Sequence, residues 1–409
     1  MSRKASLSVL VVSLLVAATL LAGAVHHANR QDESGGPLKQ LGIMVEVYQH
    51  INDDYVSTPD LAKVSDGALH GLVDSLDADS SYLDATEYQA FLAAQKNPPT
   101  AGVQAVVSKR VGYADVVSVE PGGSAAAAGL VAGDFIEAID NQGTRDMSLE
   151  EIRRRLHGAA GQSVTLSVVH LHHTDPDRVV VAFAAAHPAP LGSALQNGVG
   201  VITVPDLTAG RADQIAAAVK KLQGQGARGV LLDLRDCGAG TYAEAEKVAN
   251  LFLTQGTITY LEGQDYPKDL TTASASVAVV PSLPLDVLIN FGTYGPAEVA
   301  AAALQQNGRA KLIGDHSFGE GAVQKLIPVG DGSALWLTVA RYYSPKGKLI
   351  EDGLTPDVQQ VRYAGALPDL DVAPEGVTTQ LPDLQLQKGL SLLANPAPAA
   401  AGAAAGAGH

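Results

Sequence analysis

The sequence predicts a multidomain α/β protein, because three stretches of the 409-residue chain carry three different hydrophobic patterns. Residues 38–96 place apolar side chains at three- and four-residue intervals, which indicates helices. Residues 101–184 form short β-rich runs separated by glycine-containing turns. In residues 191–362 strands alternate with helices, the order expected of a largely parallel sheet covered by helices.

The first 30 residues predict an export signal. Arg3 and Lys4 precede an almost uninterrupted apolar run over residues 5–25, and a polar stretch follows it. The Ala22-Gly23-Ala24 pattern favours cleavage after Ala24, although a run of about 20 apolar residues is also long enough to remain as a membrane anchor. The positive charge at the start places the rest of the chain outside the cytoplasm, in the periplasm or cell envelope.

The N-terminal helical segment, residues 38–96, is predicted to contain helices over LGIMVEVYQHINDDY and SDGALHGLVDSL. The stretch LDADSSYLDATEY interrupts them, and its Asp and Ser side chains are suited to turns and helix caps. The Pro-Pro pair in KNPPT then ends the segment.

Residues 101–184 contain the runs VQAVVS, YADVVSV, DFIEAID and SVTLSVVHL and one helix, LEEIRRRLHG. Ser124 is expected to cap a short alanine helix that Gly129 ends. This module resembles a PDZ domain, a fold that captures peptide C-termini by adding them as an extra strand. The carboxylate-binding loop of that fold corresponds to Gly102, Val103 and Gln104. Because the second glycine of the loop is missing here, the resemblance implies weakened capture of a free C-terminus.

Residues 191–362 alternate GVGVITV, RADQIAAAVKKLQGQG, GVLLDLR, YAEAEKVANLFL, LDVLIN and PAEVAAAALQQNG. The strands KLIGD, AVQKLIPV and SALWLTVARYY then give the domain a more β-rich half. Residues 363–395 are predicted to be a C-terminal extension with one helix, DLQLQKGLSLLA. The Ala/Gly/Pro-rich residues 396–409 are predicted to be disordered.

The composition narrows the possible partners. With 46% hydrophobic and 17% charged residues, the chain can bury substantial cores. Its formal charge of −15, without a Lys/Arg cluster, argues against a nucleic-acid partner. A single cysteine, Cys237, excludes an internal disulfide framework. No motif predicts a cofactor.

The chain from residue 38 to 362 resembles the carboxyl-terminal processing (tail-specific) serine peptidases. The likeness rests on LDADSSYLDATEY, the PDZ-like module, GVLLDLR, NFGTYGPAE, GDHSFGEGAVQ and GSALWLTVARYYSPKGKLIEDGLTPDV, in that order. The resemblance implies a crotonase-like or ClpP-like α/β peptidase core with an inserted PDZ domain. It also implies a Ser–Lys dyad oriented by a Gln, cleavage near protein C-termini, and an active site that the PDZ domain gates.

The catalytic positions of that family carry different residues here. The corner that reads like Asn-x-Gly-Ser-Ala-Ser-Ala-x-Glu in the family places Gly295 where the nucleophilic serine belongs. The motif Phe-Gly-Lys-Gly-x-Val-Gln places Glu320 where the basic lysine belongs, and only Gln324 remains of the three. A dyad of this kind needs a neutral amine to take the serine proton, which a carboxyl group cannot replace.

The oxyanion region is altered as well. Pro296 follows the nucleophile position and has no N–H to donate. A family turn that reads like Asn-Asn-Pro-Gly-Gly appears here as residues 236–240, with Ala239 in place of a glycine. Together the changes predict a pseudopeptidase.

Other interpretations of the same residues remain open. Gly295-Pro296 would also make a favourable joint between strand and helix, and Glu320 would also fit a solvated loop. Thr293, Ser317 and Cys237 are possible substitute nucleophiles, but no base stands at a defined spacing from any of them.

Three histidines, His170, His172 and His173, could place two imidazoles on one face of a strand, although a solvated strand end explains them more simply. No metal site is therefore predicted.

The leading hypothesis is an exported pseudopeptidase that binds polypeptides or protein C-termini, through its PDZ-like module or its vacated cleft, and acts as adaptor, decoy or regulator. One alternative is an active serine-type endopeptidase with a rearranged site. Another is a purely structural part of the envelope, which residues 5–25 could hold at a membrane.

Overall fold

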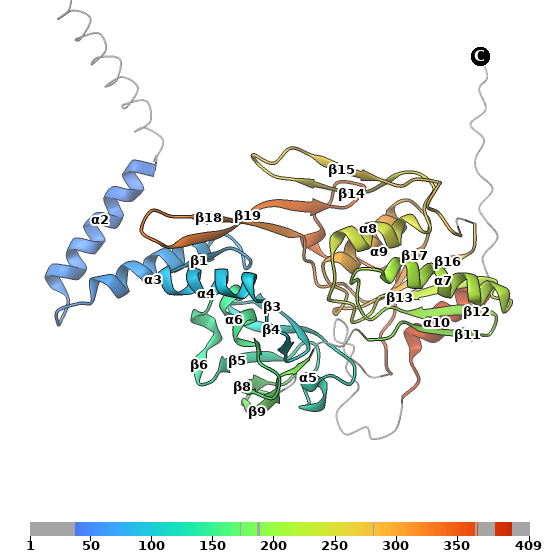
Figure 1. Cartoon of the computed structure of the whole chain (residues 1–409), viewed down its shortest axis with the longest axis horizontal. Coiled ribbons are helices and arrows are strands. Elements are labelled where there is room, and N and C mark those ends of the chain that lie inside the picture. The colour runs from blue at the N-terminus through green and yellow to red at the C-terminus, as the bar shows by residue number, and fades with distance from the viewer. Residues whose placement is uncertain are drawn as a thin grey trace, which may run out of the picture. The chain divides into compact units, whose positions relative to one another are not determined.

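The computed structural model describes residues 37–171, 173–185, 189–280, 282–364, 366 and 381–394 (Figure 1). The predicted signal and the low-complexity end, residues 396–409, lie outside the described residues. Across the described ranges, no helix combines the length and the apolarity that a membrane crossing requires. The chain divides into two units, residues 1–69 and 70–409. The first holds α2 (Pro37–Asp54) and the beginning of α3 (Leu61–Asp74).

The second unit begins with the end of α3 and continues into the short strand β1 (Ser81–Leu83) and helix α4 (Ala85–Lys96). Asp84 caps α4 in a reciprocal capping box: its carboxylate accepts the Glu87 N–H at 2.7 Å, and the Glu87 carboxylate accepts the Asp84 N–H at 3.0 Å. The predicted turn-and-cap role of LDADSSYLDATEY is therefore present. Strand β1 was not predicted, because three residues show no periodicity.

The PDZ-like module is built on an antiparallel sheet in the order β3-β4-β5-β8-β9. The strands in this order are β3 (Ala105–Arg110), β4 (Tyr113–Val119), β5 (Phe135–Ile139), β8 (Ser163–Val169) and β9 (Asp177–Ala182), and a sixth strand, β6 (Gln142–Gly143), pairs with β5. A second, small sheet joins β2 (Ala101–Gly102), β7 (His157–Gly158) and β10 (Ala184–Ala185). The remaining elements are α5 (Ser124–Ala127), η1 (Thr144–Asp146) and α6 (Leu149–Arg155).

The predicted cap of the alanine helix is wrong in detail. Gly123 is the N-cap of α5, and Ser124 is already its first helical residue. The Ser124 hydroxyl donates instead to the carbonyl of Val103 at 3.0 Å. Ser124 therefore fixes the loop that precedes β3. Gly129 follows the helix with φ of +92°, a conformation that glycine adopts without strain.

The core domain contains a six-stranded sheet in the order β11-β12-β13-β16-β17-β20. Every neighbouring pair except β11 with β12 runs parallel, so the prediction of a largely parallel sheet is confirmed. The strands are β11 (Gly192–Gln196), β12 (Val199–Thr203), β13 (Gly229–Asp233), β16 (Leu285–Ile289), β17 (Lys311–Gly314) and β20 (Val358–Gln359).

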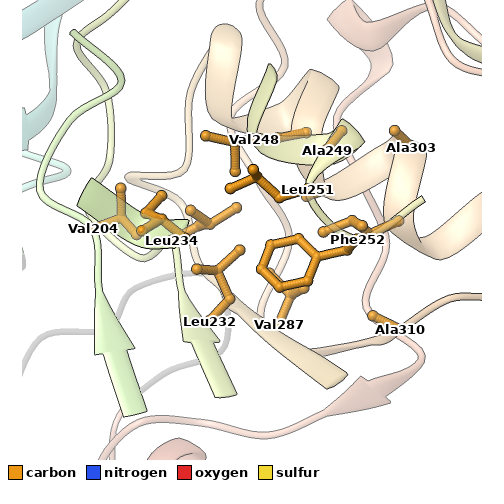
Figure 2. Close-up of a cluster of buried hydrophobic side chains, with 14 of the residues drawn as sticks. Val204, Leu232, Leu234, Val248, Ala249, Leu251, Phe252, Val287, Ala303 and Ala310 are labelled. Atoms are coloured by element: carbon orange, nitrogen blue, oxygen red, sulfur yellow. The ribbon is translucent and has the colours of Figure 1, made fainter. Parts of the chain in front are cut away.

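Three helices cover one face of this sheet: α7 (Arg211–Gly224), α8 (Tyr242–Asn250) and α9 (Pro296–Gln306) (Figure 1). Figure 2 shows the cluster between them, where Phe252 lies among Leu232, Val287 and Leu251. These side chains are almost completely removed from water, and their burial is the main stabilising term of the domain.

The opposite face is covered by α10 (Leu384–Ala394), whose Leu390 and Leu393 pack against Leu231, Leu288 and Ile313. A Cβ added to Gly389 would lie 2.8 Å from Leu231 Cδ1, so this glycine allows a close approach of helix to sheet. The helix predicted in residues 363–395 exists, but it is an integral layer of the core rather than an extension.

A fourth sheet of the unit has the order β1-β19-β14-β15, with β18 paired to β19. Its members besides β1 are β14 (Thr257–Glu262), β15 (Asp269–Thr272), β18 (Ala322–Pro328) and β19 (Ala334–Tyr343). Of the predicted β-rich half, KLIGD is β17 of the parallel sheet, while AVQKLIPV and SALWLTVARYY form β18 and β19 of this separate sheet, which also includes a strand from before the PDZ-like module. The short helix η2 (Ile350–Asp352) follows it.

Candidate active site

A tight turn connects β16 to α9 and contains the predicted nucleophile position. Gly295 is the N-cap of α9, with φ of +52° and ψ of −108°, and Pro296 is the first helical residue. A positive φ strains any side chain larger than hydrogen, so glycine is the relaxed choice here. Pro296 suits the first helical position because its missing N–H would have no partner within the helix.

The carboxylate of Glu298, one turn into α9, binds this turn to a second loop. Its Oε2 accepts the N–H groups of Gly295 and Glu320, each at 2.8 Å. Its Oε1 accepts the Gly319 N–H at 2.8 Å and the Ser317 hydroxyl at 2.5 Å. Burial raises the pKa of Glu298 to about 8, while the four donors favour the ionised form.

The Glu298 carboxylate brings the two predicted catalytic positions together. A Cβ added to Gly295 would lie 3.8 Å from Glu320 Cγ and 3.5 Å from the hydroxyl of Tyr242. Both are ordinary van der Waals separations, so a Cβ at position 295 would have room and would contact Glu320, although the positive φ strains any residue that carries one. Only 9% of Glu320 is exposed, so its interpretation as a solvated loop charge is wrong.

The electrostatic surroundings of Glu320 favour its protonated form. Burial, the largest cause, and the nearby charge of Asp79 together raise the pKa of Glu320 to about 7. The Ala322 N–H, which donates to Glu320 Oε1 at 3.0 Å, and the charge of Arg153 oppose this shift. Sequence reasoning did not identify Asp79 or Arg153, because each stands among other like-charged residues, in LDADSS and in LEEIRRR, with no spacing that relates them to residue 320.

The predicted oxyanion turn lies beside the Gly295 turn. The Asn290 side-chain amide donates to Asp236 Oδ1 at 2.8 Å, and Asn290 Oδ1 accepts the Asp236 N–H at 2.9 Å. The carbonyl of Ala239 accepts the Leu207 N–H at 2.7 Å. Asn290, which matches the family motif, therefore holds the two turns together.

A cavity of about 400 Å³ joins the PDZ-like module to the oxyanion turn. Gly102 and Gln104 line it from the module, and Gly238 and Ala239 line it from the core. Val103 is buried and donates its N–H to the Leu156 carbonyl at 3.1 Å. The structure therefore brings Gly102, Gln104 and Ala239 together at this cavity. Gly295 and Glu320 are not among the residues that line it.

Gln324, which the resemblance assigns to orienting the dyad, lies in β18. Its side-chain amide donates to Thr338 Oγ1 at 3.4 Å, and that hydroxyl donates to Asp77 at 3.2 Å. Within the described part of the chain, no hydrogen bond joins Gln324 to Glu320 or to Gly295.

The three possible substitute nucleophiles occupy structural positions. The Thr293 hydroxyl donates to the Leu234 carbonyl at 2.8 Å and accepts the Asn290 N–H at 3.0 Å. The Ser317 hydroxyl donates to Glu298 and accepts the Leu354 N–H at 2.7 Å. Cys237 is fully buried, and burial raises the pKa of its thiol, which disfavours the reactive thiolate.

The described residues of the histidine stretch are not arranged as a metal site. His170 Nδ1 lies 3.0 Å from Asp134 Oδ2, and its ring makes an edge contact with His173. His172 is outside the described residues. Among the residues that the structure describes, no three His, Cys, Asp or Glu side chains are grouped as metal ligands.

Similarity to known proteins identifies the family of this chain. Residues 198–360 match the model of peptidase family S41, and residues 116–169 match the PDZ domain. The carboxy-terminal-processing protease of Bartonella bacilliformis is 30% identical over 364 residues, covering 88% of this chain and 82% of that protein. This chain belongs to the carboxy-terminal-processing proteases of family S41.

Other carboxy-terminal-processing proteases give the same picture. The carboxyl-terminal-processing protease of Picosynechococcus sp. is 34% identical over 301 residues, with 71% of this chain and 69% of the relative covered. Among solved structures, the photosystem II D1 C-terminal processing protease matches with a TM-score of 0.65 at 23% identity, over 77% of this chain and 92% of that chain. This structural match supports the shared fold of the family: an α/β core, a PDZ domain and N-terminal helices.

The Glu298→Gln substitution tests the role of the buried carboxylate. A glutamine places an NH₂ group against two of the four donors, so we expect the free energy of unfolding to fall by about 2–4 kcal/mol. Urea unfolding measured by circular dichroism gives this value. The exposed Glu137→Gln is the matched control, with an expected change within about 0.5 kcal/mol. Equal effects of the two variants would contradict the role of Glu298.

Proposed function

We propose that this member of the carboxy-terminal-processing proteases is a pseudopeptidase that binds polypeptides and acts as an adaptor or regulator. The observation that carries the proposal is the contact between positions 295 and 320. A glycine stands in the strained turn that the family uses for its nucleophile, and a buried glutamate faces it.

The chemistry of these residues supports the loss of peptidase activity. Gly295 has no atom that can attack a carbonyl. A carboxyl group at position 320, held close to neutrality by burial, cannot replace the amine of a Ser–Lys dyad. Losing such a group lowers turnover by roughly 10⁴-fold, and losing the oxyanion donor that Pro296 cannot supply weakens transition-state binding by about 3 kcal/mol.

Two features of the PDZ-like module support polypeptide binding. Within the described residues, β3 is an edge strand that pairs only with β4, so its other edge can accept an extended peptide. The cavity lined by Gly102, Gln104 and Ala239 continues from this region toward the core. Because the Val103 N–H is already used by Leu156, we favour strand addition over capture of a terminal carboxylate.

The location follows from the predicted signal over residues 1–30. We propose that the protein is exported to the periplasm or cell envelope, where residues 5–25 are either removed or kept as an anchor. Fractionation of cells that express the full chain tests this location. Recovery of the protein with cytoplasmic markers would contradict it.

A cleavage assay tests the loss of activity. The chain without residues 1–30 is incubated with an unstructured protein that ends in apolar residues, and the Bartonella relative serves as positive control. We expect no cleavage by this chain, because Thr293 and Ser317 are engaged in structural hydrogen bonds and Cys237 is buried. Cleavage that disappears on substituting Thr293, Ser317 or Cys237 would establish the alternative, an endopeptidase with a rearranged site.

Restoring the family's residues at the altered positions tests whether the fold can still support peptide cleavage. We expect the triple variant Gly295→Ser, Pro296→Ala, Glu320→Lys to recover weak cleavage, since the space at position 295 accommodates a side chain. Gly295→Ser alone should remain inactive, and the strain at φ of +52° should lower its stability by about 1–3 kcal/mol. Activity in the single variant would show that neither the base nor the oxyanion donor is limiting.

Peptide binding is tested with two peptides of identical sequence, one with a free and one with an amidated C-terminus. We expect both to bind with affinities within about threefold of each other, because strand addition relies on main-chain hydrogen bonds. Hydrogen exchange should slow at residues 105–110 and stay unchanged at residues 177–182, the other edge of the same sheet. If neither peptide binds, a structural or tethering role is favoured instead.

A further inference from the structure

Strand β11 forms one edge of the six-stranded core sheet, and this edge lacks the usual protection against pairing. Among the residues that the structure describes, β11 pairs only with β12. Its sequence, GSALQ, contains no charged residue and no proline, and its last four residues are exposed. Because an open edge is a template for another strand, natural proteins commonly protect such edges with charges, prolines or bulges.

The other edge strands of similar length carry charged residues. Four described strands besides β11 have at least four residues and pair on one side only. Their charged residues are Lys109 and Arg110 in β3, Asp177 and Arg178 in β9, Asp269 in β15, and Lys325 in β18. Like charges placed opposite each other oppose the pairing of two identical strands. The edge of β11 is therefore the exception.

Two residues of β11 direct their backbone hydrogen-bonding groups away from the sheet. Asn197 and Gly198 join β11 to β12, and their φ angles of +51° and +78° define a type I′ turn. The residues that flank such a turn bond to each other, and bonding alternates along the antiparallel ladder from there. Every second residue of β11, counted back from Gln196, therefore bonds to β12. Ser193 and Leu195 present their N–H and C=O groups at the free edge.

An apolar side chain accompanies these outward groups. Leu195 is 40% exposed and pairs with Gly200 of β12. A Cβ added to Gly200 would lie 3.0 Å from Leu222 Cδ1, so this pair belongs to the face of the sheet that α7 covers. The helix α10 covers the other face (Figure 1). Leu195 therefore stands at the open side of α7.

We propose that β11 is a dimerisation edge, to which a second copy of this chain adds its own β11 in antiparallel orientation. A twofold axis at Ala194 would pair Ser193 of one copy with Leu195 of the other. Each of these pairs exchanges two N–H···O=C bonds, so all outward groups of both strands would be satisfied. The proposal goes beyond polypeptide binding and does not depend on it.

The charges of α7 favour a second copy over an unrelated extended segment. This helix contacts β11 as well as β12, so the two copies of α7 would lie antiparallel and side by side on one face of the joined sheet. Asp213 is in the first turn of α7 and Lys221 in its last turn. The twofold axis places each acidic turn beside the basic turn of the other copy. Both Leu195 side chains would also be covered between the helices.

Exchanging charges at residue 194 tests the twofold pairing. Its two copies face each other across the axis, so Ala194→Lys and Ala194→Glu should each halve the mass of the assembly relative to the unmodified chain. An equimolar mixture of the two variants should restore the mass. Sedimentation velocity of the full chain in detergent, at one concentration, measures this. Val180→Lys on the outer edge of β9 is the matched control and should leave the mass unchanged.

A disulfide tests where the two copies touch. The Cα atoms of a pair that is not hydrogen-bonded lie about 4.5 Å apart, within the range that a disulfide bridges. Ala194→Cys should therefore form a covalent dimer with oxidised glutathione about tenfold faster than Val180→Cys. The native Cys237 is buried and serves as an internal background. Equal rates for the two variants would overturn the proposal, even if the charged variants do not fold.

Hydrogen exchange separates a second copy from other occupants of the edge. Protection of the Ser193 and Leu195 N–H groups should increase with protein concentration and should be lost in Ala194→Lys. Protection that does not depend on concentration would show that the chain covers its own edge, and would overturn the proposal. Equal masses for the unmodified chain and both charged variants, or a mixture that does not restore the mass, would do the same.

Discussion

The Glu298 carboxylate is the constraint on which the site geometry depends. It satisfies four donors, three of them backbone N–H groups from two loops that are more than 20 residues apart in sequence. Buried N–H groups without an acceptor are costly, so each loop is fixed by its need for the same two oxygen atoms. The carboxylate therefore keeps positions 295 and 320 adjacent, whether or not these positions carry catalytic side chains.

The same arrangement makes glycine and proline favourable residues for this turn. A positive φ at residue 295 strains any residue with a side chain but not glycine. Proline next to it pre-organises the first turn of α9. The joint between β16 and α9 is therefore locally relaxed, and it offers neither a side chain at position 295 nor an N–H at position 296.

The sequence predicted the parallel sheet and its helices, because apolar runs such as GVLLDLR and PAEVAAAALQQNG have clear lengths and periods. It did not predict β1, a three-residue strand defined by its distant partner β19, or the β14–β15 hairpin. Motif spacing located Gly295 and Glu320. Asp79 and Arg153 could not be found in this way, because tertiary contacts across more than 160 residues bring them to Glu320 and no local pattern records such contacts.

The close approach of α10 to the parallel sheet has a consequence for the order in which the domain is completed. The last strand of that sheet ends at Gln359, whereas the helix that covers one of its faces begins only at Leu384. During synthesis, Leu231, Leu288 and Ile313 therefore emerge well before the residues that bury them. A nascent chain in this interval presents an apolar surface to its surroundings, and folding of the core finishes only after the residues of α10 have been made.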